Sequence, residues 1–204
     1  MMNMELERIV VGAVQTNCYL LHKNGNIILI DPGDSCRRIV RRMESYGNFN
    51  LLAILLTHGH FDHINAVDDL VNRYHCPVYA CQDDEKMLRN RRYNCMGPLH
   101  GELSCPITWL SGDQLDIGDF HFRVLYTPGH TNGSVMYLIE GMLFSGDTLF
   151  RGSVGRTDLY GGSYGKLMES LQQVRELDEK TAVYPGHEEE TTVEEELKFN
   201  PFLQ

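Results

Sequence analysis

The feature that most constrains this chain is the stretch THGHFDH at residues 57–63, which holds three of its nine histidines beside a carboxylate. The stretch follows an unbroken apolar run, residues 51–56, and precedes an amphipathic segment that begins at Ile64. This pattern predicts a turn from a buried strand into a helix. Several neutral imidazoles beside a carboxylate are costly to bury without a metal ion. We therefore expect this segment to form a metal site.

The spacing within the stretch predicts how its side chains divide. His58 and His60 are two residues apart on an extended segment, so both leave the same face and can hold one ion. Asp62 and His63 follow the turn, point elsewhere and could hold a second ion. Asp62 also has a structural alternative, as the N-cap of the following helix.

Three later segments repeat the arrangement of a ligand-type side chain at the end of a strand. His130 stands in TPGHT after a strand at 120–126, Asp147 in SGDTLF after a strand at 142–144, and His187 in PGH after a strand at 182–184. Such strand ends are where α/β proteins place their sites. The candidate metal ligands are therefore His58, His60, Asp62, His63, His130, Asp147 and His187.

Hydrophobic periodicity and turn signals predict the remaining elements. The Asn24-Gly25 pair predicts a hairpin between strands at 18–21 and 27–30. Further strands are expected at 8–11, 51–56, 78–80, 107–110 and 135–139, and helices at 36–46, 62–75, 83–90, 163–177 and within 188–197. His75 is expected to cap the end of its helix. Each half of the chain has strands followed by helices, which predicts an α/β, four-layer αββα sandwich formed as a single domain by residues 1–204.

Charge and apolar content restrict the partners. The net charge of −10 argues against nucleic acid, because phosphate binding needs a basic face. No apolar run approaches the length of a membrane span, and the first residues carry charges where a signal peptide would be apolar. We therefore expect a cytoplasmic protein with a small-molecule substrate.

The six cysteines form no CxxC pair, so we expect reduced thiols rather than a disulfide scaffold or a zinc ribbon. Cys95 or Cys105 could be a reactive thiol near the site, although a small hydrophobic residue is the favoured interpretation.

The least regular stretch, residues 89–106, contains several arginines. Long irregular segments in a compact domain are commonly functional. Two interpretations stay open: a lid or substrate wall whose arginines face an anion, and a solvated surface loop.

The motifs HxHxDH, TPGHT, SGDTLF and PGH, in this order, resemble the metallo-β-lactamase superfamily of hydrolases. The resemblance extends from the first strands to His187 and implies the αββα fold. It also implies the metal ligands: His58, His60 and His130 for one ion, Asp62, His63 and His187 for a second, and Asp147 as a bridge between both.

Within that superfamily the chain looks like the glyoxalase II-like hydrolases and the related persulfide dioxygenases. Arg156 matches the basic position that contacts substrate in glyoxalase II, and the GRTD sequence at 155–158 resembles the persulfide dioxygenases. Glyoxalase II continues into a C-terminal helical domain that holds glutathione, so this chain is similar to the short bacterial forms. The commonest β-lactamases carry a cysteine in the second site and are exported, so antibiotic hydrolysis is not expected.

The ligand set implies two divalent ions per chain, with zinc first and iron or manganese as alternatives. Two ions can generate a bridging hydroxide as nucleophile and polarise a carbonyl. Asp62 would orient that hydroxide, so Asp62 and Asp147 are the candidate catalytic residues. Arg156 and Tyr160 are the candidate substrate contacts, although Arg156 could instead pair with Asp158.

An anionic thioester suits this chemistry, because its leaving thiolate has a pKa of about 8.5 and needs little general-acid help. The sequence therefore predicts a binuclear thioester hydrolase similar to hydroxyacylglutathione hydrolase. The first alternative is a persulfide dioxygenase with one iron on His58, His130 and Asp147. A non-catalytic binding module is the second, and the intact ligand set argues against it.

Overall fold

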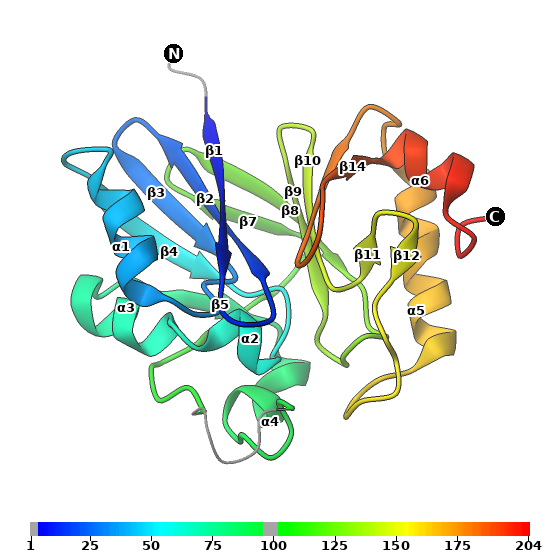
Figure 1. Cartoon of the computed structure of the whole chain (residues 1–204), viewed down its shortest axis with the longest axis horizontal. Helices are drawn as coiled ribbons and strands as arrows, with labels where there is room; N and C mark the ends of the chain where they lie inside the picture. The colour runs from blue at the N-terminus through cyan, green and yellow to red at the C-terminus, as the bar shows by residue number, and fades with distance from the viewer. Residues whose placement is uncertain (1–3, 96–101) are drawn as a thin grey trace.

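The computed structural model describes residues 4–95 and 102–204, and most of the described strands form two six-stranded sheets (Figure 1). The first sheet has the order β1 (Glu5–Val11), β2 (Thr16–Lys23), β3 (Asn26–Ile30), β4 (Asn50–Leu55), β5 (Val78–Ala80) and β6 (Thr108–Trp109). The second has the order β14 (Thr191–Thr192), β13 (Ala182–Pro185), β10 (Met142–Gly146), β9 (Val135–Ile139), β8 (Phe120–Tyr126) and β7 (Gln114–Ile117). A small hairpin pairs β11 (Leu149–Phe150) with β12 (Ser153–Val154).

The helices lie outside the two sheets. Those of the first half are α1 (Cys36–Glu44), α2 (Phe61–Ile64), α3 (Val67–Tyr74) and α4 (Glu85–Leu88), with a 3-10 turn, η1, at Gln82–Asp84. Those of the second half are α5 (Tyr164–Ser170), the 3-10 helix η3 (Leu171–Glu176) and α6 (Val193–Phe199). No described helix has the length and apolar character needed to cross a membrane.

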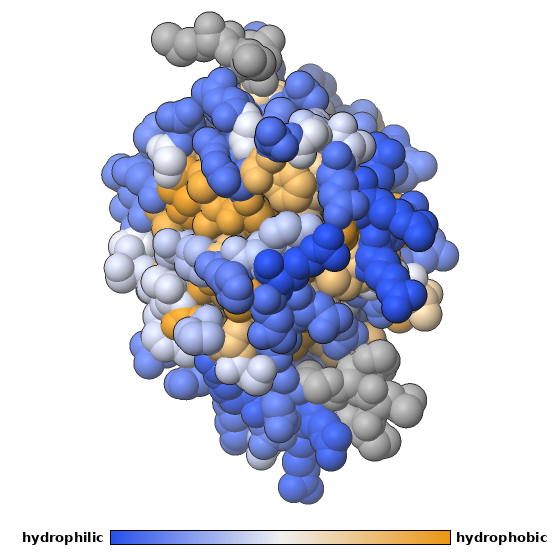
Figure 2. All heavy atoms as spheres, turned by 90° about the vertical axis from the view of Figure 1, so that its left-hand side faces the viewer, coloured by the Kyte–Doolittle hydropathy of each residue, from blue (hydrophilic) through white to orange (hydrophobic). Residues whose placement is uncertain are grey.

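Three hydrophobic clusters separate four layers. The first lies between the first sheet and helices α1 and α3, the second between the two sheets, and the third between the second sheet and α5, η3 and α6. On the side of α1 and α3, hydrophilic residues cover most of the surface and hydrophobic side chains show between them (Figure 2). The predicted αββα sandwich is confirmed.

Strand alternation explains why the first sheet is buried on both faces. In β3, Ile27 and Leu29 face the helices while Ile28 and Ile30 face the second sheet. Successive side chains of a strand point to opposite faces, so a continuous apolar run fills two interfaces at once. The predicted turn before β3 is confirmed, because Asn24 and Gly25 join β2 to β3 with φ of 52° and 75°.

The two sheets meet at the edge where the histidine motifs lie. The Val135 amide donates to the Thr57 carbonyl over 2.8 Å, and the Asn17 amide donates to the Gly186 carbonyl over 2.7 Å. The Tyr137 hydroxyl also donates to the Leu56 carbonyl over 2.9 Å. These bonds hold the ends of β4, β9 and β13 together, so loops that are far apart in sequence converge on one edge.

Several predicted elements differ from the structure. The helix expected at 62–75 is two helices, because the Ala66 amide between them donates to the Pro32 carbonyl instead of continuing the helix. Asp62 is not an N-cap: His60 holds that position, and the Asp62 carboxylate accepts from Thr16. His75 does cap its helix, with φ of 55° and a bond to the Val71 carbonyl.

Other differences concern short elements in the second half of the chain. The helix expected at 163–177 continues as the 3-10 helix η3 after Ser170, and the final helix begins only at Val193. Strands β7, β11, β12 and β14 were not predicted. Each is only two to four residues long, which is too short for a clear alternating pattern.

The irregular stretch at 89–106 is partly described, and residues 96–101 lie outside the described residues. Arg89 does not face an anion site, because its guanidinium donates to the carbonyls of Leu103 and Cys105 over 2.6 and 2.8 Å. The prediction that this stretch acts as a lid stays untested.

Candidate metal centre

All seven predicted ligands converge at the common edge of the sheets. His58 and His60 lie in the loop after β4, and Asp62 and His63 lie in α2. The other three ligands, His130, Asp147 and His187, follow β8, β10 and β13 respectively. These three strands run in the same direction in the second sheet. Six of the seven form two groups whose ligand atoms lie within 4.8 Å of one another: His58, His60 and His130, and Asp62, His63 and His187. A third such group joins His58 and His63 to Asp31.

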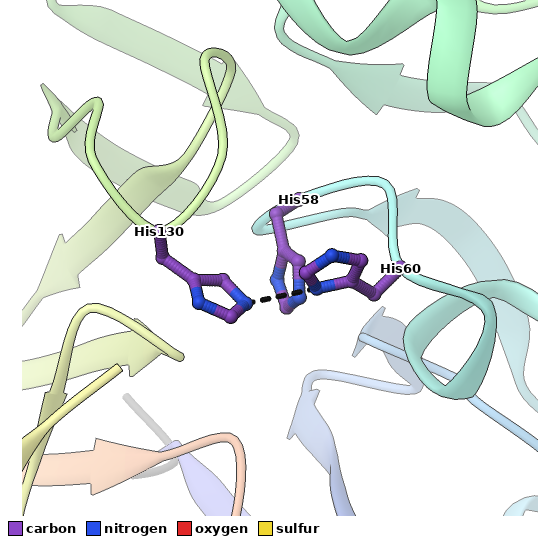
Figure 3. A group of neighbouring side chains, drawn as sticks. All are labelled: His58, His60 and His130. Atoms are coloured by element: carbon purple, nitrogen blue, oxygen red, sulfur yellow. Dashed lines mark hydrogen bonds between the residues drawn. The ribbon is translucent and has the colours of Figure 1, made fainter. Parts of the chain in front are cut away.

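The first group consists of three histidines that face one another (Figure 3). Nε2 of His130 lies 2.8 Å from Nδ1 of His60, and the three side chains are almost fully buried. Burial, and then the neighbouring His130, lowers the pKa of His60 to about 3. Burial and the other histidines also lower the pKa of His58. The His58 and His60 rings are therefore neutral near pH 7, which is the form that binds a metal.

The second group combines one carboxylate with two histidines. Nε2 of His187 lies 3.1 Å from Oδ2 of Asp62, and Nε2 of His63 lies 3.6 Å from the same oxygen. Burial alone would raise the pKa of Asp62, but His63 and His187 outweigh burial and lower it. The carboxylate is therefore ionised beside the two rings.

Asp147 lies between the two groups. Its Oδ2 is 3.6 Å from Nε2 of His130 and 3.6 Å from Nε2 of His187, while its Oδ1 is 3.4 Å from Nε2 of His63. Burial acts to raise the pKa of Asp147, but the histidines, His63 first, lower it to about 2. One ionised carboxylate thus contacts both groups.

The residues fit divalent metal ions. Within the described residues, Nε2 of His58, His60 and His63 and Oδ1 of Asp147 are buried without a hydrogen-bond partner. Such atoms cost about 1–3 kcal/mol each if they stay unpaired. Two ligands of one tetrahedral ion lie about 3.4 Å apart, given metal–ligand distances of about 2.1 Å. The separations of 3.1 to 3.6 Å around Asp62 and Asp147 are close to this value.

Sequence reasoning missed Asp31, which bonds to the His63 ring on the side away from Asp62 and Asp147. Its Oδ2 accepts from Nδ1 of His63 over 2.8 Å and from the Thr57 hydroxyl over 2.6 Å, and its Oδ1 accepts from the Thr57 amide over 2.8 Å. This bond fixes the His63 ring with Nε2 toward Asp62 and Asp147. Burial lowers the pKa of His63, but Asp147, Asp62 and Asp31 outweigh burial and raise it. The ring is therefore protonated, and a bound ion would displace the Nε2 proton. The sequence signal was an aspartate directly after the apolar strand β3.

A second missed aspartate, Asp84, fixes two of the metal loops. Its oxygens accept from the Gly59 amide over 2.9 Å, the Gly133 amide over 2.8 Å and the Thr131 hydroxyl over 2.7 Å. Burial raises the pKa of Asp84, while these bonds oppose the shift. Thr131 and Ser134 therefore organise the turn after His130 and do not contact the metal ligands through the bonds they form here.

The backbone also supports the ligands. Nδ1 of His130 donates to the Arg156 carbonyl over 2.8 Å, and the Thr16 hydroxyl donates to Oδ2 of Asp62 over 2.9 Å. Gly186 leaves room for Asp147: a Cβ at position 186 would lie 2.2 Å from Oδ1 of that carboxylate. The strand ends therefore position the ligands by close backbone packing as well as by hydrogen bonds.

The side chains of the two predicted substrate contacts, Arg156 and Tyr160, are paired with other side chains. The Arg156 side chain forms the ion pair that was its alternative, because its Nε and a terminal nitrogen donate to Asp158 over 2.7 and 2.8 Å. Tyr160 is 40% exposed and packs on Tyr93, with ring centroids 4.5 Å apart. Contact between substrate and Arg156 or Tyr160 stays a prediction.

The cysteines are all free thiols. Cys105 is buried, and burial, followed by a bond to Asp68, raises the pKa of its thiol to about 12. Cys95 is exposed, but desolvation still raises the pKa of its thiol. Neither thiol is activated, since reactive cysteines have a lowered pKa.

Comparison with known proteins gives consistent relatives. The sequence model of the Metallo-beta-lactamase superfamily matches residues 11–187. The chain is 41% identical over 207 residues to the "Probable metallo-hydrolase YqgX" of Bacillus subtilis (strain 168), a match that covers 98% of each sequence. It is 32% identical over 209 residues to the "Hydroxyacylglutathione hydrolase GloC" of Haemophilus influenzae, again over 98% of each.

Solved structures agree with these relatives. A structure described as the BLEG-1 B3 metallo-beta-lactamase has a TM-score of 0.93 and 37% identity, and covers 98% of this chain and 100% of that one. TTHA1623 in a di-iron-bound form has a TM-score of 0.88 and 37% identity, with coverage of 97% and 100%. The architecture around the centre is therefore shared along nearly the whole chain.

Proposed function

This chain belongs to the metallo-beta-lactamase superfamily of metal-dependent hydrolases, and we propose that it hydrolyses thioesters with two divalent metal ions. The observation that carries the proposal is the pair of donor groups joined by Asp147. This carboxylate lies 3.6 Å from a nitrogen of His130 in the first group and 3.4 Å from a nitrogen of His63 in the second. A carboxylate between two sets of unpaired donors is the arrangement that a two-metal site needs.

In this proposal the first ion is held by three histidines and the second by Asp62 and two histidines, with Asp147 shared. Bound ions would supply an activated water at neutral pH and would polarise the substrate carbonyl. The chain's own contribution is to orient the ligands. Burial leaves His60 neutral, and the bond from Nδ1 of His63 to Asp31 turns Nε2 of that ring toward Asp62 and Asp147.

Asp62 has a second role in the proposal. Its carboxylate stays ionised, and Oδ2 is held by the Thr16 hydroxyl at 2.9 Å and lies 3.1 Å from Nε2 of His187. A carboxylate fixed in this way can accept a hydrogen bond from a water molecule and orient it toward a carbonyl carbon. The nitrogen and oxygen donors suit zinc, which we propose first, with iron or manganese as alternatives.

The choice of a thioester rests on two supports. The Haemophilus influenzae relative, which covers the chain at 32% identity, is named a hydroxyacylglutathione hydrolase. In addition, all seven side chains at the centre are assigned as ligands in this proposal, so a substrate whose leaving group needs little protonation fits best. A thiolate with a pKa of about 8.5 is such a leaving group.

The second candidate is a persulfide dioxygenase with one iron on His58, His130 and Asp147. The di-iron form of TTHA1623, at 37% identity, favours iron but also favours two ions. In a one-iron protein, His60 and His63 would serve as hydrogen-bonding neighbours through Nδ1, which contacts His130 and Asp31 respectively. Their Nε2 atoms would then stay buried without a hydrogen-bond partner, which favours their assignment as ligands. We therefore prefer the hydrolase.

The test combines elemental analysis of the purified protein with three assays. These assays measure hydrolysis of S-lactoylglutathione and coenzyme A thioesters, oxygen uptake with glutathione persulfide, and hydrolysis of a chromogenic β-lactam. The Asp147→Ala variant serves as the matched control for background activity. The β-lactam is included because of the B3 metallo-beta-lactamase neighbour.

About two metal ions per chain, thioester turnover in the native protein and loss of both in Asp147→Ala would support the proposal. About one iron per chain with oxygen uptake and no thioester turnover would replace it with the dioxygenase. Turnover of the β-lactam alone would replace it with a lactamase.

A further inference from the structure

A pocket beside the second donor group is not used by the mechanism above. Its volume is about 160 Å³. We infer that it receives the acyl group of the substrate and that it selects small acyl groups without a negative charge. This inference rests on the proposed thioester hydrolysis. The residues that line the pocket are Gly12, Ala13, Val14, Thr16, Gly33, Asp34, Phe61, Asp62 and Asn65.

Asp62 connects the pocket to the centre, because it both lines the pocket and belongs to the second donor group. Thr16, another lining residue, donates its hydroxyl to Oδ2 of Asp62 over 2.9 Å. A carbonyl placed at the centre would therefore have the pocket next to it. In a thioester, the carbonyl carbon carries the acyl chain on one side and the sulfur of the thiol carrier on the other.

The size of the pocket limits the acyl chain. An apolar cavity of about 150 Å³ binds a benzene molecule, so a pocket of 160 Å³ holds about six non-hydrogen atoms. The wall at Gly33 must stay glycine, because a Cβ at this position would lie 1.4 Å from the Asp62 carbonyl oxygen.

The side chains that line the pocket limit the charge of the acyl group. Ala13, Val14 and Phe61 supply apolar surface, and the charged side chains among the lining residues are the carboxylates of Asp34 and Asp62. Among the residues that the structure describes, no lysine, arginine or histidine lines the pocket. A negatively charged acyl group would face two like charges without a counter-ion, which is unfavourable.

An arginine belongs to the surroundings of the first donor group, on the other side. The Arg156 carbonyl accepts from Nδ1 of His130, which places the backbone of this residue next to the first group, while its guanidinium pairs with Asp158. We therefore orient the substrate with its acyl chain toward Val14 and its anionic thiol carrier toward Arg156.

Val14 is the residue to change, because its side chain is 50% exposed and lines the pocket. The turn that carries it is fixed at both ends: the Gly12 amide donates to the Ser35 hydroxyl over 3.5 Å, and the Asn17 amide donates to the Gly186 carbonyl over 2.7 Å. Val14→Trp should fill the pocket without removing a metal ligand, and Val14→Ala should enlarge it. Phe199→Trp is the matched control, because Phe199 is 76% exposed on α6 and outside the pocket.

The first experiment compares acetyl, butyryl, octanoyl and succinyl thioesters of one thiol. For the native protein we expect kcat/KM to be highest for butyryl and at least tenfold lower for succinyl. Val14→Trp should lower kcat/KM for butyryl about tenfold while changing acetyl less than twofold. Val14→Ala should raise the value for octanoyl relative to butyryl, and Phe199→Trp should leave the whole series unchanged.

The second experiment needs no turnover. Butyrate is added to the metal-loaded protein, and the methyl signals of Val14 are followed by NMR with carbon-13-labelled valine. We expect butyrate to shift the Val14 signals much more than acetate does. Metal content and melting temperature are measured for each variant, so that a misfolded variant is recognised and the conclusion then rests on Val14→Ala and the NMR shifts.

The outcomes separate the two proposals. Thioester turnover that is equal for all four acyl groups, together with unshifted Val14 signals, would overturn the pocket assignment and leave the hydrolase intact. If Val14→Trp lowered kcat/KM equally for all four acyl groups, Val14 would be structural and the pocket assignment would likewise be overturned. Specific shifts of Val14 without any thioester turnover would support an acyl-sized pocket and overturn the proposed function.

Discussion

Replacing Asp31 by asparagine should weaken the second donor group while leaving the fold and the first group in place. Asp31 is 2% exposed, and its carboxylate accepts three hydrogen bonds, two from Thr57 and one from Nδ1 of His63. An asparagine keeps the size and one accepting oxygen. That single oxygen cannot serve both the Thr57 amide and Nδ1 of His63, and the neutral amide lacks the charge that attracts the His63 proton. The ring should therefore be held less firmly with Nε2 toward Asp62 and Asp147.

The expected magnitude follows from two effects. Removing the partner that orients a metal-bound histidine commonly lowers metal affinity about 10- to 100-fold, which corresponds to about 1.4–2.8 kcal/mol. Losing a hydrogen bond to a charged group should also lower the free energy of unfolding by about 1.5–3 kcal/mol. Both effects arise from the bond of 2.8 Å between Asp31 and His63.

The assay is competition with a metal chelator, which gives the affinity of each binding step, together with nitrogen-15 NMR of the His63 ring, which reports the protonated nitrogen. Asp69→Asn is the matched control, since Asp69 is exposed and lies outside both donor groups. We expect one weakened binding step in Asp31→Asn and two native steps in the control. Two native affinities with the His63 proton still on Nδ1 would refute the reasoning.

Three further outcomes are expected. Gly186→Ala should release metal and lower kcat, because its Cβ would lie 2.2 Å from Oδ1 of Asp147. Gly165→Ala is the control and should keep both metal and kcat, because its Cβ would meet no atom within 4 Å. Metal analysis of the two variants checks this prediction. Arg156→Ala should raise KM for anionic substrates with normal metal content, and metal loss would instead mark Arg156 as structural. The pKa of Asp68 is lowered because hydrogen bonds from two neighbouring loop residues outweigh desolvation. Its stabilising contribution is therefore present above the unfolded-state pKa, about 3.9, and is lost as pH falls through the lower folded-state pKa. Urea unfolding of the metal-free protein should accordingly show a difference between native and Asp68→Asn at pH 7 that shrinks by pH 3.

The sequence predicted the layers because their signals are local. Runs such as residues 27–30 show strands that are buried on both faces, and the Asn24-Gly25 pair shows a hairpin. Short strands such as β11 and β14 carry too few residues for any period to be visible. The break between α2 and α3 was also missed, because it depends on a bond from Ala66 to Pro32, which is far away in sequence.

The candidate site divides in the same way. The sequence by itself predicted the seven candidate ligands, since each stands in a short motif that follows a strand, and the structure brings them together at one edge of the sheets. Only the tertiary structure decided that Asp31 supports His63, that Asp84 joins the loops of Gly59 and Gly133, and that a pocket opens beside Asp62. The physical reason is that hydrogen-bond partners and empty space depend on distances between segments far apart in the chain, and these distances exist only once the two sheets have packed.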